Sequence, residues 1–167
     1  MRKQKGFSLI ELLIVVAIIL IIAAIAIPNL LRAKMAANES GAASAIRTIN
    51  TAEISYQSAY NLGYADTLVK LGNSSAAACV PAAATACLID WSLTNATAAG
   101  TAKSGYIFAV TAAAPFTTYT AGGAPKTWNQ GGVASFCSNE DGVVRRITTN
   151  NIVPVTTSAA CLAYTAL

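Results

Sequence analysis

One apolar segment, residues 6–28, restricts what this chain can fold into more than any other part of the sequence. Residues 12–27 are sixteen consecutive apolar residues, and only Ser8 and Glu11 are polar among the twenty-one residues 7–27. A helix of about 20 apolar residues spans the hydrocarbon core of a bilayer. The sequence therefore predicts a helix that crosses a membrane or packs against many copies of itself.

Charged residues near this segment predict its orientation. Arg2, Lys3 and Lys5 precede the apolar run without any acidic residue, so the positive-inside rule keeps this end cytoplasmic and sends the chain after Pro28 outward. Glu11 is the anomaly, because a carboxylate among lipid tails costs roughly 2.5 to 3.5 kcal/mol. We therefore expect a positively charged partner for Glu11.

A secretory signal peptide is the ordinary alternative for a basic leader followed by an apolar run. Its apolar region has about 7 to 15 residues and ends at a small-residue cleavage site. Here the run is longer and passes into residues 29–40, which still have a helical composition, so we expect no cleavage after it. Gly6, a small residue between the leader and the run, indicates a cut in front of Phe7 instead.

The leader and residues 6–13, GFSLIELL, carry a resemblance to a known family. They resemble the class III signal of type IV prepilins and the related pseudopilins, and Pro28 falls at the twenty-second position after the cut, as in many members. The resemblance implies that a prepilin peptidase cleaves after Gly6 and methylates the amine of Phe7. It also implies that Glu11 lies opposite the terminal amine of a neighbouring subunit, a charge pair that fixes register.

The helix is expected to continue through residues 29–60, which contain no proline and no glycine except Gly41. Pro28 removes one backbone hydrogen bond and predicts a curve or a locally unwound turn. An apolar stripe at three- and four-residue spacing predicts the surface that seats a globular head; it consists of Ala42, Ile46, Ile49, Ala52 or Glu53, and Tyr56. The charged residues between are expected on a solvated or subunit-facing surface: Arg32, Lys34, Glu39, Arg47 and Glu53.

The pattern changes after Tyr60, where Gly63 suits a left-handed helix cap. We expect a connecting loop at 61–103 and then an antiparallel meander at 104–167, because apolar residues alternate with period two. The expected strands are 106–110, 116–121, 133–138 and 142–148, with a turn at 138–142 in which Gly142 takes positive φ. The predicted fold class is α+β: a long N-terminal helix whose second half packs against a C-terminal antiparallel sheet.

The four cysteines have neither CxxC spacing nor a histidine beside them, which argues against zinc and thioredoxin-like chemistry. Because the predicted topology places them outside the cytoplasm, we expect two disulfides. Of three possible connectivities we favour Cys79 with Cys87 and Cys137 with Cys161, since these close short loops. The second pair resembles the carboxyl-terminal disulfide loop of the family.

Composition excludes several classes of function. The chain has no histidine, which removes most general-base and metal schemes, and no nucleophile motif is recognisable, so we do not expect an enzyme. The acidic residues Asp66, Asp90, Glu140 and Asp141 lack the dense spacing of a calcium loop, so no cofactor or metal is expected. Nucleic-acid binding is not expected either, since the adjacent Arg145 and Arg146 point to opposite faces of a strand.

Two functions fit these observations. The first is the structural subunit of a type IV pilus, a helical homopolymer that serves adhesion, twitching motility or DNA uptake. The alternative is a pseudopilin of a type II secretion system, and the four cysteines favour the pilin. The resemblance implies partners in a prepilin peptidase and the inner-membrane assembly machinery. It also implies a single-pass inner-membrane precursor and an extracellular filament after assembly.

Processing at Gly6 can be tested directly. We expect the purified mature protein to begin at Phe7 and to carry one additional methyl group on its amine, as read by intact-mass and N-terminal peptide mass spectrometry. An intact Met1 terminus, or a terminus after Pro28, would contradict the assignment of the leader.

Overall fold

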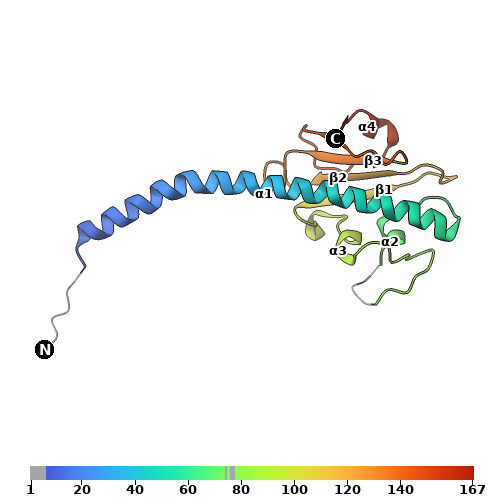
Figure 1. The fold of residues 1–167 in the computed structure, drawn as a ribbon, viewed down its shortest axis with the longest axis horizontal. Coiled ribbons are helices and arrows are strands. Elements are labelled where there is room, and N and C mark those ends of the chain that lie inside the picture. The colour runs from blue at the N-terminus through green and yellow to red at the C-terminus, as the bar shows by residue number, and fades with distance from the viewer. Residues whose placement is uncertain (1–6, 74, 76–77) are drawn as a thin grey trace. The chain divides into compact units, whose positions relative to one another are not determined.

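The computed structural model describes residues 7–73, 75 and 78–167 and confirms the predicted α+β class. The chain forms two compact units, one up to Lys34 and the other Met35–Leu167, which we call the head. A long helix, α1, precedes a sheet and several short helices (Figure 1). The basic leader and Gly6 lie outside the described residues.

Most of the helices precede the strands along the chain. The helical elements are α1 (Leu9–Tyr60), α2 (Leu68–Leu71), α3 (Trp91–Thr94), the 3-10 turn η1 (Ala99–Thr101) and α4 (Ser158–Leu162). The strands are β1 (Tyr106–Thr111), β2 (Thr120–Pro125), β3 (Ser135–Asn139), β4 (Arg145–Ile147) and β5 (Thr165–Ala166). The five strands pair in sequence order, each antiparallel to the next, which confirms the expected meander.

α1 ends at Tyr60, as expected, but its left-handed cap is Asn61, two residues before the glycine that we expected there. Asn61 adopts φ 50° directly after Tyr60, and its N–H donates to the carbonyl of Gln57 at 3.0 Å. Asparagine tolerates the left-handed region better than other non-glycine residues, so it performs the role predicted for Gly63. α1 also remains helical through Pro28, so no unwound turn forms there.

The predicted apolar stripe of α1 forms the core of the head. Ile46 and Ile49 are fully buried, as are the smaller and aromatic residues that continue the same face, Ala42, Ala52 and Tyr56. Gly123 on β2 leaves room for Phe108 of the neighbouring strand β1, because a Cβ atom there would lie 2.9 Å from Cε1 of Phe108, whereas Cδ1 of Ile46 on α1 would be at an ordinary contact distance of 3.6 Å. The glycine is therefore required by packing.

The second strand is not where the sequence placed it. β2 covers Thr120–Pro125, whereas residues 116–121 were expected, so the prediction was four residues too early at its start. Phe116 adopts φ 63° and its carbonyl accepts a hydrogen bond from the N–H of Tyr64 at 2.8 Å, which places it in a turn. The turn at 138–142 is confirmed, because Gly142 has φ 71° and donates its N–H to Asn139.

The connector at 61–103 is more ordered than the expected loop. It contains α2, α3 and η1, and its apolar residues Leu71, Ile89 and Leu93 are buried in the core. Asp90 caps the N-terminus of α3 by accepting a hydrogen bond from the N–H of Leu93. The connector therefore adds a layer of core packing to the head.

Two acidic residues expected on the surface of α1 lie against the head instead, unlike Arg32, Lys34 and Arg47, which are exposed. Glu39 accepts a hydrogen bond from the N–H of Val133 at 2.8 Å and pairs with Arg146 at 3.3 Å. Glu53 is completely buried. Both residues share the helical spacing of the apolar stripe, which is why they face inward.

Glu53 is held in an unusual state for a carboxyl group. Its Oε2 accepts a hydrogen bond from the N–H of Ala65 at 2.8 Å, and its Oε1 has no hydrogen-bond partner among the described residues. Burial raises the pKa of Glu53 to about 8, against the opposing effect of the Ala65 hydrogen bond and with a further increase from the charge of Asp66. The folded head therefore favours the protonated form.

This environment predicts how head stability depends on pH. Between pH 4.5 and pH 8 the folded state retains a proton that the unfolded state releases, so the free energy of unfolding falls as pH rises. The slope is at most about 1.4 kcal/mol per pH unit. Thermal unfolding of the detergent-solubilised full chain, followed by near-ultraviolet circular dichroism, measures it.

Glu53→Gln should flatten this slope, because the amide keeps the shape and cannot ionise. The matched control is Glu140→Gln, which changes an exposed carboxyl and should leave the slope intact. An unchanged slope in Glu53→Gln would show that another group carries the pH dependence.

Candidate assembly site

The start of α1 brings together the residues that the sequence singled out. Ser8 directly precedes the helix and Glu11 lies in its first turn. The backbone N–H of Ser8 donates to Oε2 of Glu11 at 2.9 Å. This is the acidic half of a capping box, in which a glutamate three residues on satisfies a donor that the helix leaves unpaired. The carboxylate also lies at the end of the helix where the dipole favours negative charge.

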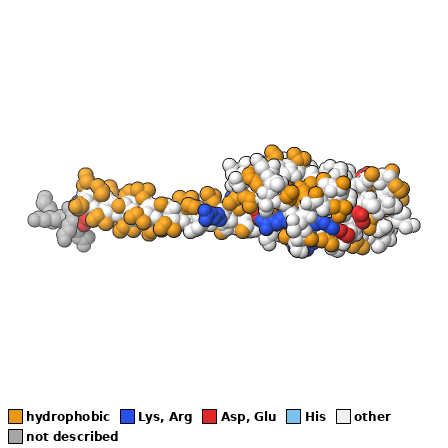
Figure 2. Space-filling view, turned by 90° about the horizontal axis from the view of Figure 1, so that it is seen from above, with side chains coloured by type: hydrophobic (Ala, Val, Ile, Leu, Met, Phe, Trp, Pro, Cys, Tyr) orange, Lys and Arg blue, Asp and Glu red, His pale blue; other side chains and the backbone are white. Residues whose placement is uncertain are grey.

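The following part of α1 is not covered by any other described residue of its own chain. None of its most apolar window is buried, and Phe7 is 80% exposed. Figure 2 shows hydrophobic side chains over this part of the helix. α1 is long and apolar enough to cross a membrane by length and composition. So large an apolar surface requires a bilayer or other protein to cover it.

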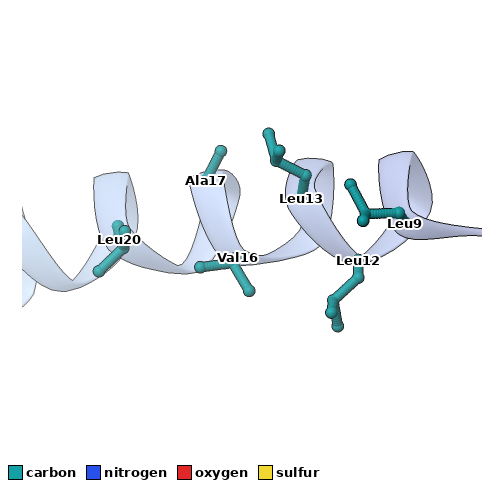
Figure 3. Close-up of a pocket in the computed structure, with 6 residues that line it drawn as sticks. All are labelled: Leu9, Leu12, Leu13, Val16, Ala17 and Leu20. Atoms are coloured by element: carbon teal, nitrogen blue, oxygen red, sulfur yellow. The ribbon is translucent and has the colours of Figure 1, made fainter.

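The apolar side chains surround the helix on more than one side. Six of them line a groove along its first turns: Leu9, Leu12, Leu13, Val16, Ala17 and Leu20. Because these six recur at three- and four-residue spacing they share one face, and in Figure 3 Leu13 and Ala17 point toward one edge of it and Leu12 and Val16 toward the other. The opposite face is apolar and exposed as well, since it carries Ile14, Ile18 and Ile21. A helix that is hydrophobic all round is one that becomes buried, which distinguishes this segment from the one-sided stripe that carries the head.

The predicted site residues are only partly brought together. Glu11 lies next to Ser8, and Phe7 is adjacent in the chain. Pro28 lies seventeen residues after Glu11 on the same helix, about 26 Å along the axis at 1.5 Å per residue, so it does not share this site. Sequence reasoning missed the hydrogen-bonding role of Ser8, although the S-x-x-E spacing of a capping box could have indicated it.

The cysteines lie in the head and belong to a different feature. The structure joins Cys79 to Cys87 within the connector and Cys137 on β3 to Cys161 on α4, with Cα atoms 5.9 and 5.7 Å apart. Cys137 and Cys161 are fully buried. The second bond therefore ties the C-terminal segment to the sheet, which constrains a part of the chain that has little helix or strand of its own.

The two arginines considered for nucleic-acid binding both have acidic partners. Arg145 forms an ion pair with Asp141, and the hydrogen bond from its guanidinium holds the pKa of Asp141 below its usual range. Arg146 pairs with Glu39 on α1. Among the described residues no group of three potential metal ligands occurs. These two ion pairs therefore connect residues within the head.

Comparison with known proteins agrees with the assembly site. Residues 1–27 match the model of the prokaryotic N-terminal methylation motif. The chain is 65% identical over 40 residues to the type IV wide pilus major component PilA4 of Thermus thermophilus, covering 24% of this chain and 30% of that protein. It is 46% identical over 54 residues to the type IV major pilin protein PilA of Myxococcus xanthus, covering 32% and 24%. No solved structure matches significantly.

The first 27 residues therefore carry an N-terminal methylation motif. Together with the two relatives, which are both named as type IV pilin components, this motif supports a similarity to type IV pilins. The matches cover less than a third of the length of either relative, so what those proteins do as wholes is not transferred by the similarity alone.

The two cysteine pairs yield a measurable prediction for the head. The chain-entropy model gives about 3.5 kcal/mol for the loop closed by Cys137 and Cys161 and about 2.5 kcal/mol for the shorter loop closed by Cys79 and Cys87. Replacing both members of each pair by alanine should lower the free energy of unfolding in that order. Denaturant unfolding of the solubilised full chain measures both values.

A mass-spectrometric control tests the bonds themselves. Alkylation of the native protein should label none of the four cysteines, and alkylation after reduction should label all four. Labelling without reductant would contradict the pairing.

Proposed function

We propose that this chain is the structural subunit of a type IV pilus, which polymerises through the first part of α1. The observation that carries the proposal is the apolar surface around residues 9–27, which no other described part of the chain covers. A filament in which these helices surround one another would remove that surface from water. At about 25 cal/mol per Å² of buried apolar area, this burial is the main driving force of assembly.

Glu11 gives the assembly its register. Cleavage after Gly6 by the prepilin peptidase would convert the amide nitrogen of Phe7 into an ammonium group. The hydrogen bond from Ser8 uses one oxygen of the Glu11 carboxylate. The other oxygen then remains for the Phe7 ammonium of the neighbouring subunit, and each helix both gives and receives one such contact.

The charge pair contributes mainly to specificity, because an arrangement that leaves either charge unpaired is destabilised. A paired carboxylate and ammonium only partly recover the cost of leaving water, whereas one of them alone in an apolar interior costs several kcal/mol. Subunits docked in a shifted register would leave these charges unpaired. Apolar burial therefore supplies the affinity, and the pair selects one arrangement.

Before assembly the same surface would be covered by lipid. We propose a single-pass precursor in the inner membrane with Arg2, Lys3 and Lys5 on the cytoplasmic side. The assembly machinery would extract it into an extracellular filament that serves adhesion, motility or DNA uptake. Pro28 would lie near the outer boundary of the membrane, where a missing backbone hydrogen bond is accommodated more easily than at the centre.

Substitution of Glu11 tests the mechanism. Glu11→Ala should reduce the amount of sheared filament at least about tenfold, which corresponds to about 1.4 kcal/mol per docking step. The precursor in the membrane and the disulfides of the head should remain normal. Glu11→Gln retains an acceptor for the Ser8 N–H but loses the charge, so it separates capping from pairing.

The measurement is immunoblotting of sheared filaments, normalised to total chain, with electron microscopy of the same cells. Glu140→Ala is the matched control, because it removes an exposed carboxylate from the head and should leave filaments normal. Filaments of normal abundance and length in Glu11→Ala would overturn the charge-pair mechanism.

A further inference from the structure

One large aromatic side chain of the head remains exposed where burial would be favourable. Trp91, the first residue of α3 (Figure 1), is 42% exposed. A tryptophan side chain provides one of the largest apolar surfaces of any residue, and nearly half of the connector consists of alanine, threonine and serine. The exposed part of the indole is therefore available to a ligand.

Trp91 forms part of a pocket of about 290 Å³ between α3 and the segment that contains η1. We call it the Trp91 pocket. Most of the surface that lines it is apolar, and the polar atoms at its wall come from Ser92, Asn95, Thr101 and Lys103. Typical sites for small molecules have volumes of about 300 to 1,000 Å³, so this one suits a single ring.

The walls of the Trp91 pocket are held in place by the fold. Asp90 accepts hydrogen bonds from the N–H of Leu93 at 3.2 Å and from the hydroxyl of Ser92, which fixes the start of α3. The end of α3 is joined to the sheet, because the carbonyl of Ala96 accepts from the N–H of Phe108 at 2.7 Å. The indole of Trp91 is therefore carried by a fixed element.

Charge limits the kind of ligand. Lys103 Nζ donates to both oxygens of Asp90, at 2.7 and 2.9 Å, so the two charges beside the pocket neutralise each other. An anion would have to compete with Asp90, and a cation with Lys103. The remaining groups are an indole face, a side-chain amide and hydroxyls, which suit a neutral ligand with an apolar face and several hydroxyl groups.

We propose that the Trp91 pocket binds one pyranose ring of a neutral sugar. The C–H groups on one face of the ring would lie on the indole, because the face of an aromatic ring is negative and attracts positively polarised hydrogens. The Asn95 amide would donate to and accept from the ring hydroxyls, whereas Ser92 and Thr101, whose hydroxyls already donate to Asp90 and to the carbonyl of Ala98, would accept hydrogen bonds from them. This inference is independent of filament assembly, since every group involved belongs to one head.

Tryptophan fluorescence tests the proposal on the unassembled full chain. The chain is solubilised in a zwitterionic detergent without a sugar headgroup, and Trp128→Phe leaves Trp91 as the sole tryptophan. The probes are the methyl pyranosides of glucose, galactose, mannose and N-acetylglucosamine. At least one should produce a saturable change in fluorescence with a Kd in the millimolar range.

Variants identify the site. In saturation-transfer NMR, Trp91→Ala should abolish the sugar signal and Asn95→Ala should weaken binding about tenfold, by loss of one hydrogen-bonding side chain. Val80→Ala is the matched control, because it removes another exposed apolar side chain of the connector and should bind normally. Circular dichroism and the cysteine count confirm that each variant is folded.

Two results would overturn the proposal. One is the absence of a saturable response to any of the four sugars, or an equal response in Trp91→Ala. The other is complete protection of Trp91 from acrylamide quenching in assembled filaments, which would assign the pocket to a second copy of this chain. Neither result bears on whether filaments form, so failure here leaves the proposed function to be tested separately.

Discussion

The apolar surface of the first part of α1 has no partner among the described residues of its own chain, and the other features of the molecule depend on how it is covered. Water is excluded as its permanent surroundings, because burial of a single large aliphatic side chain is worth about 1.5 to 3 kcal/mol. A bilayer satisfies the requirement for one molecule, and neighbouring helices satisfy it for many. The proposed transfer between these environments explains why one segment combines the properties of a membrane anchor and an interface.

A single helix serves two kinds of packing. Near its start α1 is apolar all round, whereas within the head it buries only the stripe that contains Ile46 and Ile49. Two further features support the packing of the head beside α1. Small residues of β2 leave room for the side chains packed against them, and two disulfides restrain the connector and the C-terminal segment. The hydrogen bonds that Glu39 and Glu53 accept then fix the position of α1 within the head.

The sequence predicted the parts of the fold in which apolar residues recur with a clear period. α1, the stripe on its second half and the antiparallel meander all follow from spacing alone, as does the turn at Gly142. β2 was misplaced because its sequence, TAGGAP, has no hydrophobic alternation. Its two glycines are required by close contacts with Phe108 on β1 and with the backbone of Val155, which lie outside the sequence of the strand itself. Local pattern contains no information about such contacts.

The candidate site was predicted from the same segment, but its geometry was not. The hydrogen bond from Ser8 to Glu11 depends on where α1 begins, and the hydrogen bond that the buried Glu53 accepts depends on the loop that supplies the N–H of Ala65. The short helix that carries Trp91 escaped prediction because four residues are too few for a period to appear. The contact of Glu53 is tertiary, whereas the hydrogen bond from Ser8 to Glu11 is local and follows the S-x-x-E spacing.

The most direct test of the central claim is a cryo-electron-microscopy reconstruction of filaments isolated from cells that express this chain. The account predicts that residues 7–34 of neighbouring copies pack together in the filament core. It also predicts that the Glu11 carboxylate lies within hydrogen-bonding distance of the Phe7 nitrogen of another copy. A filament in which these helices are separated and exposed, or in which Glu11 lies away from every terminal amine, would contradict it.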